Sequence, residues 1–266
     1  MQPDYHLHTV LCKHAEGDVS EFVAAAREKG IPEICFTDHV PAPDGYDQEN
    51  RMDLGRFPEY NELVSRVRGS ENPNVLFGIE ADYYEGCEGF LRKWLPKQQF
   101  DLVLGSIHYI GDWGFDNPLN RTVWDSVDVT ATWREYFKLV CKLADTRIFN
   151  ILAHPDLSKR FGHRPKDKDV KEMVQPALDR IALAGMGIEI NTSGLRRPVK
   201  EIYPAPLILE LARERNIPIT FGSDSHRPAE VGYGFPEALA LARSCGYTQS
   251  LRFHQRERRL VNLESD

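Results

Sequence analysis

DYHLHT, residues 4–9, places two histidines one residue apart in a short stretch of alternating apolar and polar residues. In an extended strand, residues i and i+2 point to the same face, so His6 and His8 would aim at one point in space. Such a pair indicates either a metal site or an ordinary half-buried strand. The hexapeptide leaves both interpretations open, and the rest of the chain has to decide.

Strand-like and helix-like segments alternate along the 266 residues. One helical pattern opens with a capping box, Asp18 with Glu21, and closes on Gly30. Seven strands alternating with helices predict an α/β fold with a parallel sheet, whose active site lies at the C-terminal ends of the strands. No repeat or composition break divides the chain, so we expect residues 1–266 to form one domain. The strand candidates are DYHLHTV, EICFTDHV, NVLFGIEADY, FDLVLGSIHYI, FNILAHPD, GIEINTSG and IPITFGSD.

The composition predicts a cytoplasmic protein without a membrane or nucleic-acid partner. No window is apolar over a membrane-spanning length, and the start MQPDYHLHT lacks the features of a secretory signal. The five cysteines are scattered, without a C-x-x-C pair, which fits a reducing compartment. The net charge of −7 disfavours binding to a polyanion. The RERR segment near residue 256 is predicted to be a solvated edge of a tail.

Residues of the kind that bind metals gather at the predicted C-terminal ends of successive strands. Nine such ligands are too many for one ion, since zinc takes about four, but they suit two or three ions that share a bridging carboxylate. The ligand types admit Zn, Fe or Mn and do not select one of them. The set contains seven of the nine histidines and two carboxylates: His6, His8, His14, His39, Glu80, His108, His154, Asp224 and His226.

The motifs that carry these residues resemble those of the polymerase and histidinol phosphatase (PHP) superfamily, over residues 4–226. The matching motifs are H-L-H with the following His14, T-D-H, G-I-E, S-I-H, A-H-P-D and G-S-D-S-H. Three longer segments, FTDHVP, LGSIHYIGDWGFDNP and HPDLSKRFGHRP, resemble the stand-alone histidinol-phosphate phosphatases of this superfamily.

The resemblance implies a distorted TIM-like (β/α)7 barrel with a trinuclear metal site. It assigns Glu80 as the carboxylate that bridges two ions, one of them completed by His108 and His154. By the same analogy, His6, His8 and Asp224 complete the first ion, whereas His14, His39 and His226 hold the third.

A cation cluster of this kind suits the hydrolysis of a phosphate monoester. A water that bridges two ions would lose a proton near neutral pH and attack phosphorus, and the remaining ion would neutralise the developing charge. Glu80 and Asp224 are the expected catalytic residues, Asp224 orienting the water or taking its proton. The substrate implied by the resemblance is L-histidinol phosphate, and the pathway is histidine biosynthesis.

Candidate substrate-binding residues follow the later strands. Arg160 and Arg197 lie in loops at the correct end of the barrel for a bidentate phosphate clamp, with Arg196 as a competitor of Arg197. Asn191 and Ser193 either hydrogen-bond the substrate or cap the end of their strand.

The substrate also carries an amine and an imidazole, so its pocket needs hydrogen-bond acceptors and a flat wall. The irregular segment 111–128 contains Phe115 and Asn117 among other aromatic and polar residues, and it is predicted to act as a lid over the site.

Two other functions remain open at this point. One is a nucleotide phosphatase or exonuclease of the same superfamily, against which the acidic net charge argues. The other is a metal-stabilised scaffold without turnover, although structural zinc sites are usually closed and rich in cysteine.

Overall fold

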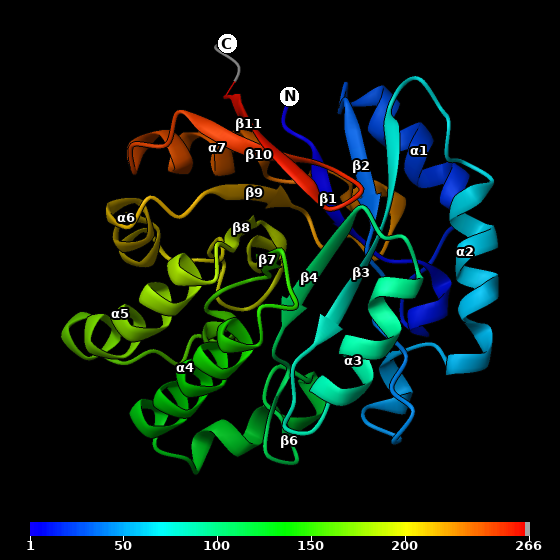
Figure 1. Ribbon diagram of the computed structural model, residues 1–266. Helices are drawn as coiled ribbons and strands as arrows, with labels where there is room; N and C mark the ends of the chain where they lie inside the picture. The colour runs from blue at the N-terminus through cyan, green and yellow to red at the C-terminus, as the bar shows by residue number, and fades with distance from the viewer. Residues whose placement is uncertain (264–266) are drawn as a thin grey trace.

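Seven parallel strands form a nearly closed barrel in a computed structural model that describes residues 1–263 (Figure 1). The strands follow the chain in the order β1-β2-β3-β4-β7-β8-β9, each beside its predecessor. This arrangement confirms the α/β barrel predicted from the sequence. The barrel strands are β1 (Asp4–Leu7), β2 (Glu33–Phe36), β3 (Asn74–Asp82), β4 (Leu102–Ser106), β7 (Ile151–Leu152), β8 (Gly187–Asn191) and β9 (Ile219–Gly222).

The first strand meets the chain just beyond the last strand. The amide of His8 donates to the carbonyl of Ser225 at 2.9 Å, and the amide of Ser225 donates to the carbonyl of His6 at 3.1 Å. The fully buried Asp4 carboxylate strengthens this seam by accepting from the amides of Ser223 and Gly232, each at 2.8 Å. The seam brings the histidines of β1 next to the loop after β9.

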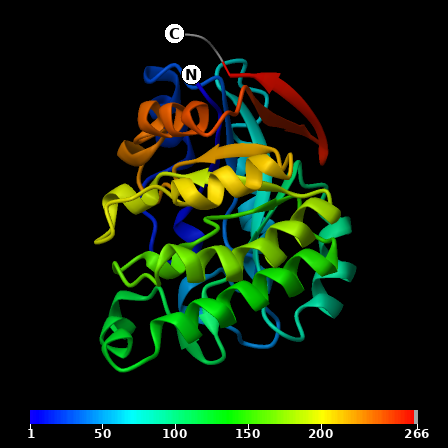
Figure 2. The same cartoon turned by 90° about the vertical axis from the view of Figure 1, so that its left-hand side faces the viewer.

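Helices cover the outside of the barrel, and in Figure 2 the helices α4 to α7 lie in successive rows along one side. Helix α1 begins as predicted: Ser20 N donates to Asp18 Oδ1 at 2.9 Å, and Asp18 N donates to Glu21 Oε2 at 2.6 Å. Such a cap contributes about 1 kcal/mol. No helix among residues 1–263 has the length and apolar character needed to cross a membrane. The helices are α1 (Val19–Glu28), α2 (Phe57–Ser65), α3 (Glu88–Trp94), α4 (Val129–Thr146), α5 (Asp167–Leu183), α6 (Pro206–Glu214) and α7 (Phe235–Ser244).

The RERR residues are mostly exposed, as predicted, but the segment that contains them is not a tail, which corrects that part of the prediction. It forms an antiparallel hairpin of β10 (Gln249–His254) and β11 (Glu257–Asn262). The hairpin lies across the end of the barrel where the strands begin (Figure 1), and it adds Leu251 and Phe253 to an apolar cluster with strand residues such as Leu104. The opposite end of the barrel is left open for the polar residues described below.

A second, two-stranded hairpin lies in the loop after β4. It consists of β5 (Tyr109–Ile110) and β6 (Trp113–Gly114), and a 3₁₀ helix at Pro118–Asp125 follows it. These elements give the predicted lid segment a defined structure beside the mouth of the barrel.

Candidate metal centre

Glu80 on β3 lies at the centre of the polar cluster. Its Oε2 atom is 3.3 Å from His6 Nε2 and 3.1 Å from His39 Nδ1, whereas its Oε1 atom is 3.0 Å from His154 Nε2 and 3.7 Å from His108 Nε2. His8 Nε2 also lies 3.5 Å from Oε2, so each carboxylate oxygen faces a different set of imidazoles. This is the arrangement that a carboxylate shared between two ions requires.

Asp224 forms a second centre in the loop after β9. Its Oδ1 atom lies 3.4 Å from His8 Nε2 and 3.5 Å from His226 Nδ1. The backbone of Asp224 has a φ of +53°, in the left-handed region that non-glycine residues seldom occupy. Conformations of this kind are concentrated at functional sites.

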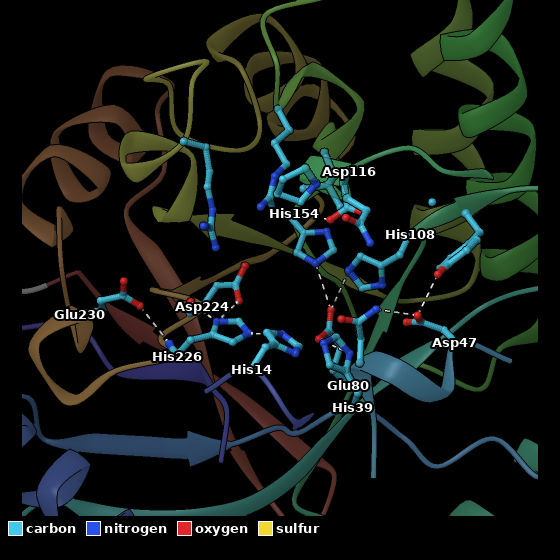
Figure 3. A pocket seen from close by; sticks show the side chains of 18 of the residues that line it. His14, His39, Asp47, Glu80, His108, Asp116, His154, Asp224, His226 and Glu230 are labelled. Carbon is cyan, nitrogen blue, oxygen red and sulfur yellow. Dashed lines mark hydrogen bonds and ion pairs between the residues drawn. The ribbon is translucent and has the colours of Figure 1, made fainter. Parts of the chain in front are cut away.

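His14 and His226 complete the cluster on its solvent side. Their Nε2 atoms lie 2.8 Å apart. Together with His39 they form a group in which every donor atom is within 4.8 Å of the others. All nine residues predicted from the sequence are thus brought together at one end of the barrel. Figure 3 shows the seven of them that line the cavity described below.

The residues fit a metal centre because several buried donors have no other partner. His6 Nε2, His8 Nδ1, His8 Nε2 and His39 Nδ1 are buried and accept or donate no hydrogen bond within residues 1–263. A buried polar atom without a partner costs free energy, and a bound cation removes that cost. Imidazole and carboxylate donors are suited to divalent transition metals.

The electrostatics of the cluster keep its carboxylates ionised. Burial raises the pKa of Glu80, but the imidazoles of His39 and His6 outweigh burial and hold that pKa well below its ordinary value. Asp224 is affected in the same way, burial being outweighed by His6, His8 and His226. Both carboxylates are therefore in the form that binds a cation.

Two buried carboxylates that were not predicted from the sequence contact histidines of the cluster. Asp82 lies 3.1 Å from His108 Nδ1 through its Oδ2 atom, and it also receives a hydrogen bond from Arg51 Nη2 at 2.7 Å. Glu189 on β8 lies 2.8 Å from His6 Nδ1 and accepts from the amide of His154 at 2.9 Å. Carboxylates in such positions fix the orientation of metal-binding imidazoles. Asp82 follows Glu80 by two residues on the same strand, so strand alternation is the signal that points to it.

Replacing Glu189 by glutamine is expected to weaken metal binding by about 10- to 100-fold, because the amide would no longer attract the proton on His6 Nδ1. Competition against a chelator of known affinity measures the change. Glu214→Gln, at an exposed position, is the control. Equal metal affinity in Glu189→Gln and the wild type would show that Glu189 serves only the packing of the barrel.

A cavity of about 380 Å³ opens above the cluster. Its wall includes the predicted Arg160 and Arg197, together with Asp116 and Asn117 of the predicted 111–128 segment. It also includes three groups that the prediction did not contain, Asp47, Tyr109 and Glu230. Asp47, Asp116 and Glu230 are labelled in Figure 3. Arg196 is instead committed elsewhere, since its Nη2 atom donates to the carbonyls of Ser223 and Asp224 at 2.7 and 3.0 Å.

Three predicted substrate-binding residues, Phe115, Asn191 and Ser193, do not line this cavity. Phe115 is fully buried, and its ring packs edge-on against Tyr136 with the centroids 5.6 Å apart. Asn191 Oδ1 accepts from the amide and the hydroxyl of Ser193 at 2.9 and 2.7 Å. The polar atoms of Asn191 and Ser193 thus cap the end of β8.

The barrel and its cluster of seven histidines and two carboxylates define the class of the protein, a (β/α)7 barrel with a cluster of side chains suited to bind cations at its open end. The chain belongs to the PHP domain family, which matches residues 4–193, and a PHP-associated family matches residues 206–238.

The chain is similar over most of its length to proteins named as histidinol-phosphatases. It is 41% identical over 245 residues to a "probable histidinol-phosphatase" of Deinococcus radiodurans, covering 91% of this chain and 93% of that protein. It is 24% identical to the histidinol-phosphatase of Bacillus subtilis, covering 89% and 97% of the two chains.

Among solved structures, the fold is similar to that of the histidinol phosphate phosphatase of Lactococcus lactis, which was solved with zinc, L-histidinol and phosphate. The TM-score is 0.82 at 22% identity, and the alignment covers 97% of this chain and 98% of the other. This likeness supports the distorted barrel architecture.

Proposed function

We propose that the protein hydrolyses L-histidinol phosphate to L-histidinol and inorganic phosphate, a reaction of histidine biosynthesis. The observation that carries the proposal is a single cavity that joins the Glu80-centred cluster to two arginines, Arg160 and Arg197. The names of the relatives from D. radiodurans and B. subtilis support the choice of substrate. The five free cysteines fit a reducing compartment, and we place the reaction in the cytoplasm.

The nine clustered side chains would hold two to three divalent transition-metal ions, zinc being the one present in the L. lactis structure. Bound there, the ions would lower the pKa of water and neutralise phosphoryl oxygens. Asp224 is the residue that we assign to orient the attacking water or accept its proton, because its carboxylate is ionised and lines the cavity.

Arg160 and Arg197 are suited to grip the phosphoryl group. Each has an Nε atom without a hydrogen-bond partner in the described part of the chain. Arg160 Nη1 lies 3.5 Å from Asp116 Oδ2, which leaves its remaining donors for a ligand. Guanidinium groups bind phosphate through paired N–H donors.

The protonated amine of the substrate requires an acceptor, and the cavity offers three carboxylates besides Glu80 and Asp224. Asp47 and Asp116 are bound to arginines at 3.0 and 3.5 Å, and Glu230 accepts from the amide of His226 at 3.0 Å. Tyr109, whose hydroxyl donates to Asp47 at 2.8 Å, supplies a flat wall for the imidazole.

Replacing Arg197 by alanine is expected to raise KM about tenfold while kcat changes little, because a clamp that acts equally on substrate and transition state affects binding alone. Steady-state kinetics on L-histidinol phosphate separates the two constants. Arg180→Ala, whose guanidinium is paired with Asp145 on the outer helices, is the control. A large fall in kcat at constant KM would place Arg197 in the chemical step instead.

The substrate proposal is tested by comparing kcat/KM for L-histidinol phosphate with that for sugar phosphates, nucleotides and short single-stranded DNA. We expect a preference for L-histidinol phosphate of several orders of magnitude. Comparable turnover of nucleotides or DNA would overturn the biosynthetic assignment and favour the nucleotide phosphatase or exonuclease alternative.

A further inference from the structure

Lys159 is a fully buried cation that the chemistry proposed above does not use. It directly precedes Arg160 in the loop after β7, in a 3₁₀ helix at Leu157–Lys159. Lysine is almost never fully buried unless its ammonium group is paired, so a buried lysine next to a ligand-binding arginine requires an explanation.

The ammonium group of Lys159 joins two loops. It donates to the carbonyl of Ile202 at 2.7 Å and lies 3.3 Å from Glu201 Oε2, both in the loop after β8. Within its own loop it lies 3.0 Å from Asp156 Oδ2. It also lies 5.3 Å from the ring centre of the buried Tyr203.

Two further hydrogen bonds connect the same loops. Asp156 Oδ2 accepts from the amide of Ala205 at 2.9 Å, and the amide of Val199 donates to the carbonyl of Arg160 at 3.1 Å. The loop after β7 carries Arg160, and the loop after β8 carries Arg197. The contacts of Lys159 and these two hydrogen bonds together join the backbones that carry the two arginines.

Two guanidinium groups that line one cavity repel each other when no anion lies between them. Without a rigid support, the loops would relax so as to separate the charges, and an incoming phosphoryl group would have to draw them together again. A ligand clamp that is held in place before binding avoids this cost.

We propose that Lys159 is a positioning residue that sets the spacing of Arg160 and Arg197 and thereby the affinity for the phosphoryl group. The inference rests on the proposed function, because it assumes that the two arginines bind phosphate. It predicts that the loss of Lys159 weakens the affinity for the phosphoryl half of the substrate and leaves the affinity for the alcohol half unchanged.

The test uses the metal-loaded protein with Lys159→Met, which keeps the length of the side chain and removes its charge. Calorimetry measures the Kd of inorganic phosphate and, separately, of L-histidinol, and kinetics measures KM and kcat. We expect the phosphate Kd and KM to rise about tenfold, with the Kd of L-histidinol and the metal content within about twofold of wild type. Lys159→Arg, which keeps the charge, is expected to recover part of the phosphate affinity.

An unchanged phosphate Kd in folded Lys159→Met would overturn the inference, as would an equal loss of affinity for phosphate and L-histidinol.

If Lys159→Met does not fold, Glu201→Gln serves as the test, since Glu201 is 47% exposed and its replacement buries no charge. We expect Glu201→Gln to raise the phosphate Kd about two- to threefold. Arg164→Ala, which removes the other ion pair of Glu201, is the matched control and is expected to leave the phosphate Kd unchanged. Equal phosphate Kd values for Glu201→Gln and wild type would then overturn the inference.

The experiment also separates this inference from the substrate assignment. A wild-type protein that does not turn over L-histidinol phosphate, but whose phosphate Kd rises in Lys159→Met, would support the positioning role of Lys159 and overturn the proposed substrate.

Discussion

Glu80→Gln is expected to lose turnover of L-histidinol phosphate by about a thousandfold, well beyond the 10- to 100-fold typical of residues that only support a metal ligand. Glutamine has nearly the same shape, but it is neutral and presents an amide nitrogen on one side. It cannot offer an anionic oxygen both to His6 and His39 and to His108 and His154. Metal content should fall together with kcat, and both are measured on the same sample.

The control for this variant is Glu59→Gln on the outer helix α2, where the carboxylate is paired with Arg56 at the surface. Near wild-type turnover in Glu80→Gln at full metal content would show that Glu80 does not bridge the site.

Asp224→Asn is the second large effect that we expect, a fall in kcat of about 100- to 1000-fold with little change in KM. Asparagine tolerates the left-handed backbone conformation found at this position, so the substitution removes the negative charge without straining the loop. The charge that is lost is the one facing His6, His8 and His226.

Comparison of Asp224→Asn with Asp224→Ala separates the effect of the lost charge on turnover from the effect of backbone strain on stability. Alanine should reduce kcat to a similar extent and also destabilise the fold by about 1 kcal/mol, because its Cβ atom is disfavoured at a φ of +53°. Thermal melts and steady-state kinetics on both variants give the two effects independently. A change in KM alone would assign Asp224 to substrate binding.

The cluster could be predicted from the sequence because parallel strands end together. His6, Glu80, His154 and Asp224 are far apart along the chain, yet each lies at or near the C-terminal end of a strand of one barrel. The barrel itself is confirmed, whereas the individual roles of the nine residues, and the expectation that residues 1–266 form one domain, stay predictions.

Residues that contact the predicted ligands without belonging to a metal-binding motif were not predicted from the sequence. Asp82 and Glu189 belong to no motif of their own. Only the structure shows that their carboxylates contact the ring nitrogens of His108 and His6. Lys159 is a similar case, since a lysine in a loop is ordinarily solvated and only its three oxygen neighbours show that it is buried for a reason.

The differences between the structure and the prediction have local physical causes. The β10–β11 hairpin turns through Gln255 and Arg256, both with positive φ, where glycine or asparagine would have signalled the turn. Phe115 lies in an aromatic segment of which only part faces the cavity, and the sequence does not tell the two sides apart. Ser193 donates two hydrogen bonds to the side chain of Asn191, and this local pattern competes with ligand binding.

We propose that several metal ions at one barrel mouth together perform phosphate ester hydrolysis. The most direct test of this proposal is stepwise loading of the metal-free protein with zinc, in which bound metal and turnover of L-histidinol phosphate are measured on the same samples. We expect turnover to remain low after the first equivalent and to reach its maximum only when two to three ions are bound. A fully metal-loaded protein without turnover of any phosphate ester would contradict this proposal and favour a metal-stabilised scaffold.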